Sequence, residues 1–278
     1  NHNDAYNIAK ALNASGNPYG FNGAADSHLM KNSEWGAVAY LSKSQYGLGA
    51  TDITVNNINL NNSTESVYAV TGCTSNSTTS GQRITTIETI MGSDGTGTTG
   101  NTANGGVYTW DQLTGTTASC TGTIYGIYDL SGGAWERTTG YVANENGSLG
   151  NGRSIAYDGS TLRTISTKYT TVYLHNSETD KPGITDVAND STNLNKASTN
   201  NWLANTLIYG DAIRETSTAG TGSTSWYSDG SNFPGLYYPF SVRGGSYNSG
   251  TSAGLFCFNR TNGGSFYNNG FRAVVVVS

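Results

Sequence analysis

Apolar positions recur at helical spacing only near the start of the chain. Residues 5–12 carry Ala, Ile, Ala and Leu at i, i+3, i+4 and i+7, which predicts a short amphipathic helix that ends before Gly16. A second helix is predicted from Ser33, which can serve as its N-cap, with Glu34 in the first turn and Gly47 beyond its end. Both helices precede the region in which strands are predicted.

Beyond residue 50, short runs of apolar and β-branched residues alternate with turn-forming stretches, which is typical of strands. The predicted strands span residues 67–70, 107–110, 124–128, 134–142, 170–174, 240–247 and 271–277. No strand is predicted before residue 28, whereas residues 273–277 are all apolar and would be an aggregation hazard if unpaired. We therefore expect this last strand either to pair with an inner strand or to need a partner from upstream sequence.

Two polar segments interrupt the pattern. Residues 74–106 and 144–200 are rich in Ser, Thr, Gly and Asn with few periodic signals, which predicts long surface insertions. No shift in composition isolates a second core. We therefore expect one α+β domain over residues 1–278, with residues 1–27 as an N-terminal helical segment.

Composition narrows the class of protein further. Only 12% of the 278 residues are charged and 35% are hydrophobic, so Gly, Asn, Ser and Thr fill the difference. A net charge of -5 with 18 Tyr, 7 Phe and 5 Trp argues against disorder. Because the chain has no basic stripe and no apolar run near the roughly 20 residues of a membrane span, we expect neither a nucleic-acid partner nor direct membrane insertion.

Two short motifs match enzyme signatures, but their surroundings argue against both. Residues 95–100 fit GxGxxG without the flanking strand and helix that a dinucleotide site needs. Residues 250–254 fit the GxSxG nucleophile elbow, yet no His follows Ser252 as that fold requires. We expect a flexible loop at the first motif and a surface hydroxyl at the second.

The metal-ligating residue types form no recognisable motif. The three His are far apart, and the three Cys show no CxxC pairing. The carboxylates in residues 180–190 lack EF-hand spacing, so no cofactor is expected, with a structural calcium ion as an alternative. A disulfide between Cys73 and Cys120, leaving Cys257 free, stays open at this point.

Three segments carry the most specific signal. Ser-Glu-Trp-Gly-Ala-Val-Ala-Tyr occupies residues 33–40, Ile-Tyr-Gly-Ile-Tyr-Asp-Leu-Ser-Gly-Gly-Ala-Trp-Glu occupies 124–136, and Arg-Gly-Gly-Ser-Tyr at 243–247 is followed by Gly-Phe-Arg at 270–272. Together they resemble the formylglycine-generating enzyme (sulfatase-modifying factor) superfamily over residues 28–277, although the intervening loops do not match and Gly133 stands where that family has Asn. The resemblance implies an α+β C-type lectin-like fold with short twisted antiparallel sheets, two N-terminal helices and long irregular loops.

Physical chemistry suggests scaffold roles for the residues in these segments. The glycines at 132–133 allow a tight turn from which Trp135 leaves for the core. Arg243, Arg272 and Glu136 can form charge-assisted hydrogen bonds that fix an otherwise irregular fold. We therefore expect these side chains to be structural rather than catalytic.

The chemistry of the resembled enzymes is not expected here. Their oxidases need a reactive Cys pair after the Arg-Gly-Gly-Ser strand, because soft thiolates hold Cu(I). This segment has only Cys257, with Asn248 and Ser249 where the first Cys would stand. The His-rich iron site of the related sulfoxide synthases is missing as well. We expect a protein that is not an enzyme, with a formylglycine-generating-type oxidase as the less favoured alternative.

The variable proteins of diversity-generating retroelements have the same fold. In them, the stretch between Arg-Gly-Gly and Gly-Phe-Arg displays mutable side chains, and the resemblance implies that role for residues 243–272. That stretch is rich in Tyr, Phe, Asn and Ser, the mixture of rigid aromatic contacts and adaptable hydrogen bonding found in antibody paratopes. Trp226, Phe240 and Phe271 are assigned to the core. The predicted ligand-binding residues are Tyr227, Asp229, Asn232, Tyr237, Tyr238, Tyr247, Asn248, Ser249, Phe258, Asn259, Thr261, Asn262, Ser265, Phe266, Tyr267 and Asn268.

The expected function is recognition. We expect an extracellular ligand-binding or adhesion module on a bacterial surface or pilus-associated protein, which binds a protein or glycan ligand on another cell or surface. A phage virion receptor-binding protein is the alternative. The chain starts at Asn1 without Met, so we expect a processed or partial product, with an upstream anchor or assembly partner left open.

Overall fold

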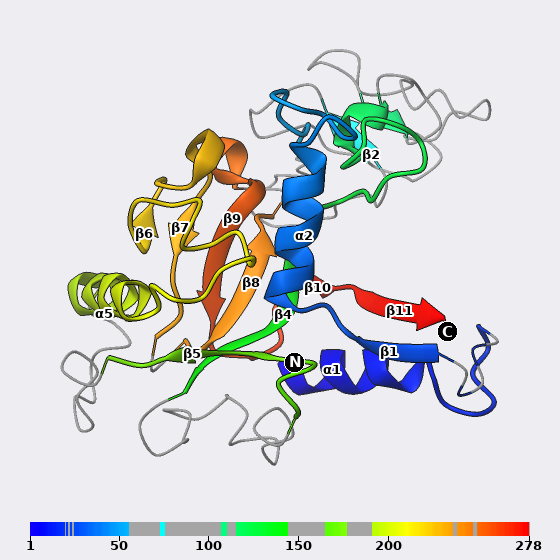
Figure 1. Ribbon diagram of the computed structural model, residues 1–278, viewed down its shortest axis with the longest axis horizontal. Coiled ribbons are helices and arrows are strands. Elements are labelled where there is room, and N and C mark those ends of the chain that lie inside the picture. Colours follow the sequence, from blue (N-terminus) through cyan, green and yellow to red (C-terminus); the bar gives the residue numbers. More distant parts are fainter. Residues whose placement is uncertain are drawn as a thin grey trace.

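The computed structural model describes residues 1–19, 21, 23, 25–55, 73–75, 107–109, 115–143, 165–176, 191–235, 238–246 and 249–277. The fold is α+β: a curled sheet is accompanied by few helices and by two separate strand pairs (Figure 1). In the described ranges, no helix is long and apolar enough to span a membrane. The predicted strand at 67–70, the GxGxxG match at 95–100 and the acidic run at 180–190 lie outside these ranges.

Helix α1 (His2–Ala11) confirms the first predicted helix and begins earlier than expected. Asn1 caps it, because its side-chain oxygen accepts the backbone N–H of Asp4 at 2.9 Å. The helix buries Ala5, Tyr6 and Ala9 in a cluster with residues of the sheet. Of the predicted apolar stripe, Ala5 and Ala9 pack against the sheet, whereas Ile8 is 55% exposed and the buried Tyr6 was not part of the predicted stripe.

Helix α2 (Asn32–Ser42) confirms the second, but Ser33 is not its N-cap. The helix begins two residues earlier than predicted, with Lys31 at the cap, and the Glu34 carboxylate accepts the Lys31 N–H at 2.8 Å. Gly36 allows a close approach, since a Cβ there would lie 2.1 Å from the carbonyl oxygen of Gly210. This contact packs α2 against the segment that contains Gly210 and Asp211, and α2 is drawn beside β8 in Figure 1.

The main sheet is built on three antiparallel strands, β4 (Trp135–Ala143), β8 (Phe240–Gly244) and β9 (Gly254–Thr261). Strands β10 (Asn269–Phe271) and β5 (Thr171–Leu174) run parallel to β4 at its two ends, while β7 (Ser231–Asn232) and β6 (Thr221–Gly222) extend the sheet beyond β9. The predicted strands at 134–142, 170–174 and 240–247 therefore exist, with small changes at their ends.

A large bulge interrupts the pairing of β8 with β9. Arg243 is opposite Phe258, but the next residue, Gly244, is opposite Gly254. Residues 255–257 therefore form an insertion in one strand, and Leu255 and Phe256 from it are buried with Trp35 of α2. A periodic pattern does not predict such a bulge.

The C-terminal strand β11 (Ala273–Val277) pairs antiparallel with β1 (Ala25–Leu29), and the two lie side by side in Figure 1. The expectation that no strand begins before residue 28 is wrong. Asp26, Ser27 and His28 hide the strand pattern because they are polar, and two of them are buried. The apolar strand thus has a partner, which is neither an inner strand nor upstream sequence.

Residues 124–128 do not form the predicted strand. They lie in a series of turns in which Cys120 N–H donates to the Ile127 carbonyl at 3.0 Å, and Thr side chains bond nearby backbone groups. Strand β3 (Val107–Thr109), which pairs with β2 (Cys73–Ser75), confirms the strand predicted at 107–110.

The polar segment at 144–200 is not loop throughout. It contains β5 and the larger part of helix α5 (Ser191–Ala204), whose Trp202 is buried with Tyr173 and Phe258. Of the three aromatics assigned to the core, Phe240 is buried, but Trp226 and Phe271 are 48% and 37% exposed. Cys120 and Cys257 are both buried free thiols, so the Cys73–Cys120 disulfide is not formed.

Candidate ligand-binding site

A hollow of about 240 Å³ lies where β4, β6, β7 and β9 meet the turn η4 (Gly250–Ser252). Four predicted site residues line it: Asn232, Ser249, Phe258 and Asn259. Its other walls come from residues that were not predicted to bind a ligand: Trp135, Gly222, Gly230, Ser231, Ser252 and Cys257. The fold thus brings together side chains that are up to 124 positions apart, counting from Trp135 to Asn259.

Two asparagines fix the polar side of the hollow. Asn232 Nδ2 donates to Asn259 Oδ1 at 2.8 Å, and Ser198 Oγ donates to Asn232 Oδ1 at 3.1 Å. The same Asn259 oxygen accepts the backbone N–H of Arg260 at 2.8 Å. Asn259 Nδ2 makes no hydrogen bond within the described residues, so it stays available to a ligand.

Trp135 joins the hollow to an exposed loop. Its backbone N–H donates to the carbonyl of Asn268 at 2.8 Å, and Asn269 is its register partner in β10. Trp135 was predicted to lie in the core, but it is only partly buried and lines the hollow. The sequence signal for this position was an aromatic residue two positions after the Gly132–Gly133 turn.

The loop after β9 is held at both ends and exposed in between. Near its start, His2 N–H donates to the carbonyl of Gly263 at 2.9 Å, and the Arg137 guanidinium donates to the carbonyl of Gly264. At its end, Trp135 holds Asn268. Ser265 between them is exposed, and Phe266 and Tyr267 are 47% and 80% exposed. The loop therefore presents two aromatic rings next to the hollow.

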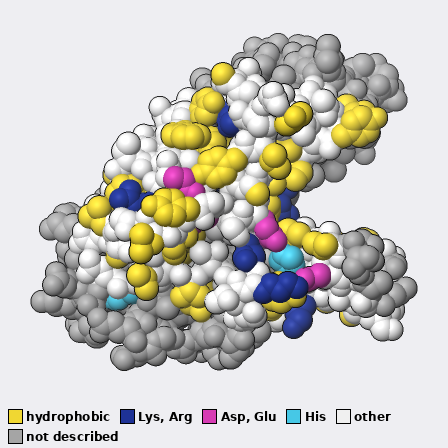
Figure 2. Space-filling model, in the orientation of Figure 1, with side chains coloured by type: hydrophobic (Ala, Val, Ile, Leu, Met, Phe, Trp, Pro, Cys, Tyr) yellow, Lys and Arg dark blue, Asp and Glu magenta, His cyan; other side chains and the backbone are white. Residues whose placement is uncertain are grey.

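The electrostatics of the hollow are neutral. No Lys, Arg, Asp, Glu or His is among the described residues that line it. Burial, together with the nearby charge of Asp229, raises the pKa of the Cys257 thiol, which keeps it protonated and unreactive. More widely, charged side chains gather around one histidine in Figure 2, while most of the visible face is polar or apolar without charge.

Asp229 does not reach the surface, contrary to its predicted role in ligand binding. It is 1% exposed, and its Oδ2 accepts the backbone N–H of Phe256 at 2.8 Å. Its Oδ1 has no hydrogen-bond partner in the described part of the chain. Burial, reinforced by Asp52, raises the pKa of Asp229 to about 8. Through its hydrogen bond with the Phe256 N–H, the Asp229 carboxyl group stabilises the bulge at residues 255–257.

Other predicted site residues serve the frame or contact other parts of the fold. Phe258 and Thr261 are buried, because they face the core and the turn after β9. Asn262 Oδ1 accepts the Gly264 N–H at 2.9 Å within that turn. Tyr227 stacks on Phe256 beside α2, and Tyr238 faces the Arg260 guanidinium, so neither lines the hollow. Tyr237, Tyr247 and Asn248 lie outside the described residues.

The charged scaffold residues divide into two groups. Arg272 Nη2 donates to Glu136 Oε1 at 2.9 Å and to the carbonyls of Tyr128 and Asp129, which confirms that predicted pair. Arg243 does not join them. Fully buried, it donates to backbone carbonyls, that of Asp211 at 2.9 Å and that of Leu255 at 3.5 Å.

The hydrolase-like motif at 250–254 has the wrong geometry for a nucleophile elbow. Ser252 lies in a 3-10 turn that precedes strand β9, whereas the elbow places its Ser between a strand and a following helix. Its hydroxyl makes no hydrogen bond within the described residues, consistent with the surface hydroxyl expected from the sequence.

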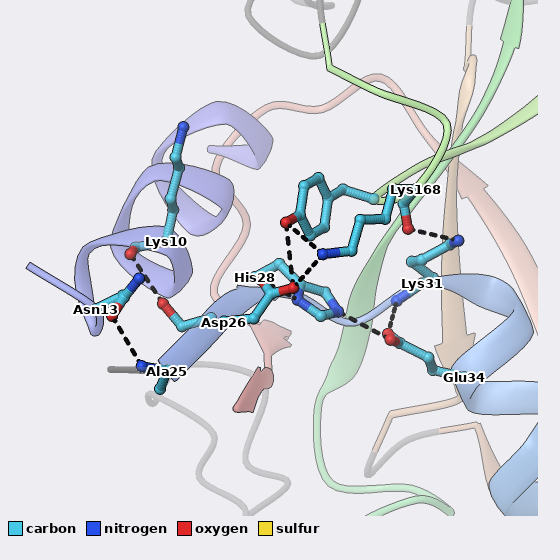
Figure 3. A network of polar contacts seen from close by, with 10 residues as sticks. Lys10, Asn13, Ala25, Asp26, His28, Lys31, Glu34 and Lys168 are labelled. Carbon is cyan, nitrogen blue, oxygen red and sulfur yellow. Dashed lines mark hydrogen bonds and ion pairs between the residues drawn. The ribbon is translucent and has the colours of Figure 1, made fainter. Parts of the chain in front are cut away.

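A second polar cluster surrounds His28, beside an open hollow of about 720 Å³ (Figure 3). His28 Nε2 lies 2.8 Å from Glu34 Oε1, and Nδ1 lies 3.4 Å from Asp26 Oδ1. Lys168 Nζ donates to Asp26 Oδ2 at 2.6 Å, and Lys31 Nζ donates to the Lys168 carbonyl at 2.7 Å. These contacts connect the turn before β5 with β1 and α2. The cluster, called the clasp below, therefore has a structural role.

The protonated form of His28 suits this clasp best. The positive charge of the imidazolium lies beside two carboxylates: Nε2 is hydrogen-bonded to Glu34, and Nδ1 lies 3.4 Å from Asp26 Oδ1 without a hydrogen bond. The hydrogen bond with Glu34 raises the pKa of His28, and the same contact lowers that of Glu34. Across the described ranges, no group of three or more His, Cys, Asp or Glu is placed to hold a metal ion.

Comparison with known proteins adds no relative. No protein-family model matches the chain, and no curated protein matches it.

Proposed function

We propose that this chain is a non-enzymatic ligand-binding module whose contacts are made by one neutral face. That face consists of the hollow and the loop residues Ser265, Phe266 and Tyr267, and is called the recognition face below. The observation that carries the proposal is the 2.8 Å hydrogen bond from Trp135 N–H to the Asn268 carbonyl, which holds the exposed loop against the wall of the hollow. Rigid aromatic rings beside unengaged amide and hydroxyl groups suit recognition of a surface.

The finer fold assignment, a C-type lectin-like fold, belongs to the same proposal. Its support is that each resembled segment has a framing role: Trp35 of the Glu-Trp helix donates to the Leu255 carbonyl at 2.7 Å, and Arg272 pairs with Glu136. The Arg-Gly-Gly segment supplies the buried Arg243. The recognition face lies between these fixed points.

We further propose that the segment between Arg243 and Arg272 is diversified by a retroelement. Adenine-directed mutagenesis of Asn-type codons yields Asn, Ser, Tyr, Thr and Phe, the residue types found there. Sequencing the gene from many isolates tests this. Substitutions are expected to concentrate at residues 246–269, at exposed positions such as Tyr267 rather than at buried Phe258. Substitutions spread evenly over the gene would contradict it.

The proposed setting is extracellular, on a bacterial surface or pilus-associated protein, with a protein or glycan on another cell as the ligand and no cofactor. The alternative to a protein without a cofactor is one that binds a structural calcium ion. The proposal also includes an upstream anchor or assembly partner. A phage virion receptor-binding protein is the other setting. Neighbouring genes separate them, since virion genes would surround a tail protein.

Binding is tested with the fluorescently labelled chain on a panel of bacterial and animal cells. Saturable binding to at least one cell type, displaced by unlabelled chain, is expected. Binding to none, or binding that does not saturate, would contradict the proposal.

The enzyme alternative is tested separately. Incubation of the chain with copper and a sulfatase-type Cys peptide is expected to give no formylglycine. Any turnover would contradict the assignment as a non-enzymatic protein.

A further inference from the structure

We infer that the hollow binds one neutral sugar ring. This inference rests on the proposed recognition function and names the chemical class of ligand for one part of the recognition face. It is carried by the polar groups around the hollow, their charge and the size of the space.

The hollow offers hydrogen-bonding groups that the fold leaves unengaged. In the described part of the chain, Ser252 Oγ, Asn259 Nδ2 and Trp135 Nε1 make no hydrogen bond. Ser249 Oγ accepts the Ser246 N–H at 3.0 Å and lies 3.4 Å from Ser246 Oγ, so it is the one partly engaged group of the four. Each of these atoms is accessible to a ligand, because none belongs to the described polar atoms that are buried without a hydrogen-bond partner. Together they offer donors and acceptors in close proximity, as a ring with several hydroxyl groups requires.

The absence of charged side chains among the described lining residues disfavours charged small ligands. A phosphate, carboxylate or amine would find no opposite charge among the described lining residues, and burying it unpaired is costly. A purely apolar ligand would leave the Asn and Ser groups without partners. A sugar ring satisfies both conditions, because it is neutral, carries hydroxyl groups and presents an apolar face that can lie on the partly buried Trp135.

Size and strand pairing limit what else can enter. The hollow of about 240 Å³ is smaller than the usual range of ligand pockets, roughly 300 to 1,000 Å³, so it accommodates one ring rather than an extended chain. An extended peptide would need a free strand edge, but β7 pairs on both sides, and β6, the edge strand beside the hollow, is only 2 residues long. A monosaccharide unit at the end of a glycan fits these limits.

The test uses two-dimensional NMR of the whole 15N-labelled chain. Methyl glycosides of mannose, galactose, glucose, N-acetylglucosamine and fucose are titrated in turn, with N-acetylneuraminic acid and a neutral tetrapeptide as other ligand classes. At least one neutral glycoside is expected to shift the indole N–H signal of Trp135 saturably, with a Kd in the millimolar range. Since the lining contains no described carboxylate, the shift is expected to persist in EDTA.

Two matched variants locate the binding. Ser252→Phe fills the hollow without removing a described side-chain hydrogen bond, and Thr251→Phe puts the same ring on the exposed neighbouring residue of η4. Ser252→Phe is expected to weaken sugar binding at least tenfold, and Thr251→Phe less than twofold, with both spectra showing a folded chain. If Ser252→Phe fails to fold, Gly230→Ala serves instead, since its added methyl meets Ser252 and Cys257 of the hollow at 3.3–3.5 Å.

The inference is overturned if no neutral glycoside shifts the Trp135 signal, if only the acidic sugar or the peptide does, if EDTA abolishes binding, or if the two Phe variants behave alike. These outcomes leave the proposed function intact where cell binding still saturates. Loss of cell binding itself would instead contradict the proposed function.

Discussion

The guanidinium of Arg243 donates to the backbone carbonyl of Asp211 at 2.9 Å, in the interior of the protein. The same fork reaches the carbonyls of Ala212 and Leu255, and Trp35 donates to that Leu255 oxygen as well. The bulge at 255–257 is therefore held from two sides by buried donors. Since the bulge precedes Phe258 and Asn259, this contact positions the recognition face.

Replacing Arg243 by Lys should be costly, because an ammonium cannot match the planar fork that reaches three carbonyls. We expect Arg243→Lys to lower the free energy of unfolding by about 3 kcal/mol. The partly buried Arg260 is the matched position, and Arg260→Lys should cost less than about 1 kcal/mol. Urea unfolding followed by Trp fluorescence measures both. Equal losses would contradict the role assigned to Arg243.

Asp229 should make stability fall as pH rises. Its pKa is about 8 in the folded chain against 3.8 for the free side chain, so the folded state holds its proton more tightly. The resulting stabilisation is complete below about pH 4 and is lost progressively up to about pH 8. Asp229→Asn keeps an oxygen for the Phe256 N–H and cannot ionise. We expect this variant to exceed the parent in stability by more than about 1 kcal/mol at pH 8, and to match it at pH 4.

Asp211→Asn provides the contrast in that experiment. Burial raises the pKa of Asp211 to about 6, but its carboxylate also faces the Arg243 charge and accepts the Tyr173 hydroxyl at 2.7 Å. Removing it should therefore destabilise the protein at neutral pH. If Asp229→Asn lowers the free energy of unfolding at pH 8 as Asp211→Asn does, the claim that Asp229 is buried in its protonated form is wrong.

His28 should titrate above its ordinary value of 6.5, because Glu34 stabilises the imidazolium. The clasp then contributes stability that is fully present below pH 6.5 and is lost as pH rises through the raised pKa. The ring signals of His28 in an NMR titration report this directly. We expect Glu34→Gln to lower the measured pKa towards 6.5. A parent pKa below 6.5 would contradict the clasp as described.

The thiols of Cys120 and Cys257 should both be free. When the chain is unfolded without reductant, iodoacetamide is expected to label both, as seen by peptide mass spectrometry. A Cys73–Cys120 cross-linked peptide in the digest would show that the free state of Cys120 is wrong. Labelling of the folded chain should be slow at Cys257, since burial raises the pKa of its thiol.

The periodic pattern of apolar residues predicted several of the helices and strands correctly. The helices at 2–11 and 32–42 and the strands at 135–143 and 240–244 follow from periodicity. Strand β1 was missed because its polar residues are satisfied by partners far along the chain, such as Lys168 for Asp26. The strand predicted at 124–128 is wrong because hydroxyl side chains and the Cys120 N–H hold those residues in turns.

The site was predictable in part for the same reason. Asn232, Ser249 and Asn259, which line the hollow, were predicted as ligand-binding residues because their residue types can make adaptable polar contacts. Asp229 was assigned wrongly, since its burial depends on the backbone of Phe256, 27 positions away. Trp135 was placed in the core because a sequence does not reveal that its neighbour in space is the loop ending at Asn268.

The most direct test of the recognition face compares two double variants in the cell-binding assay. Phe266→Ser with Tyr267→Ser removes both exposed rings of the loop, whereas the control pair, Tyr46→Ser with Tyr125→Ser, removes two rings elsewhere that are exposed to 79% and 90%. We expect the first pair to raise the Kd for the bound cell type at least tenfold, as loss of aromatic anchors does, and the second to change it less than twofold. Unchanged binding by the first pair, or equal loss from both, would contradict the account.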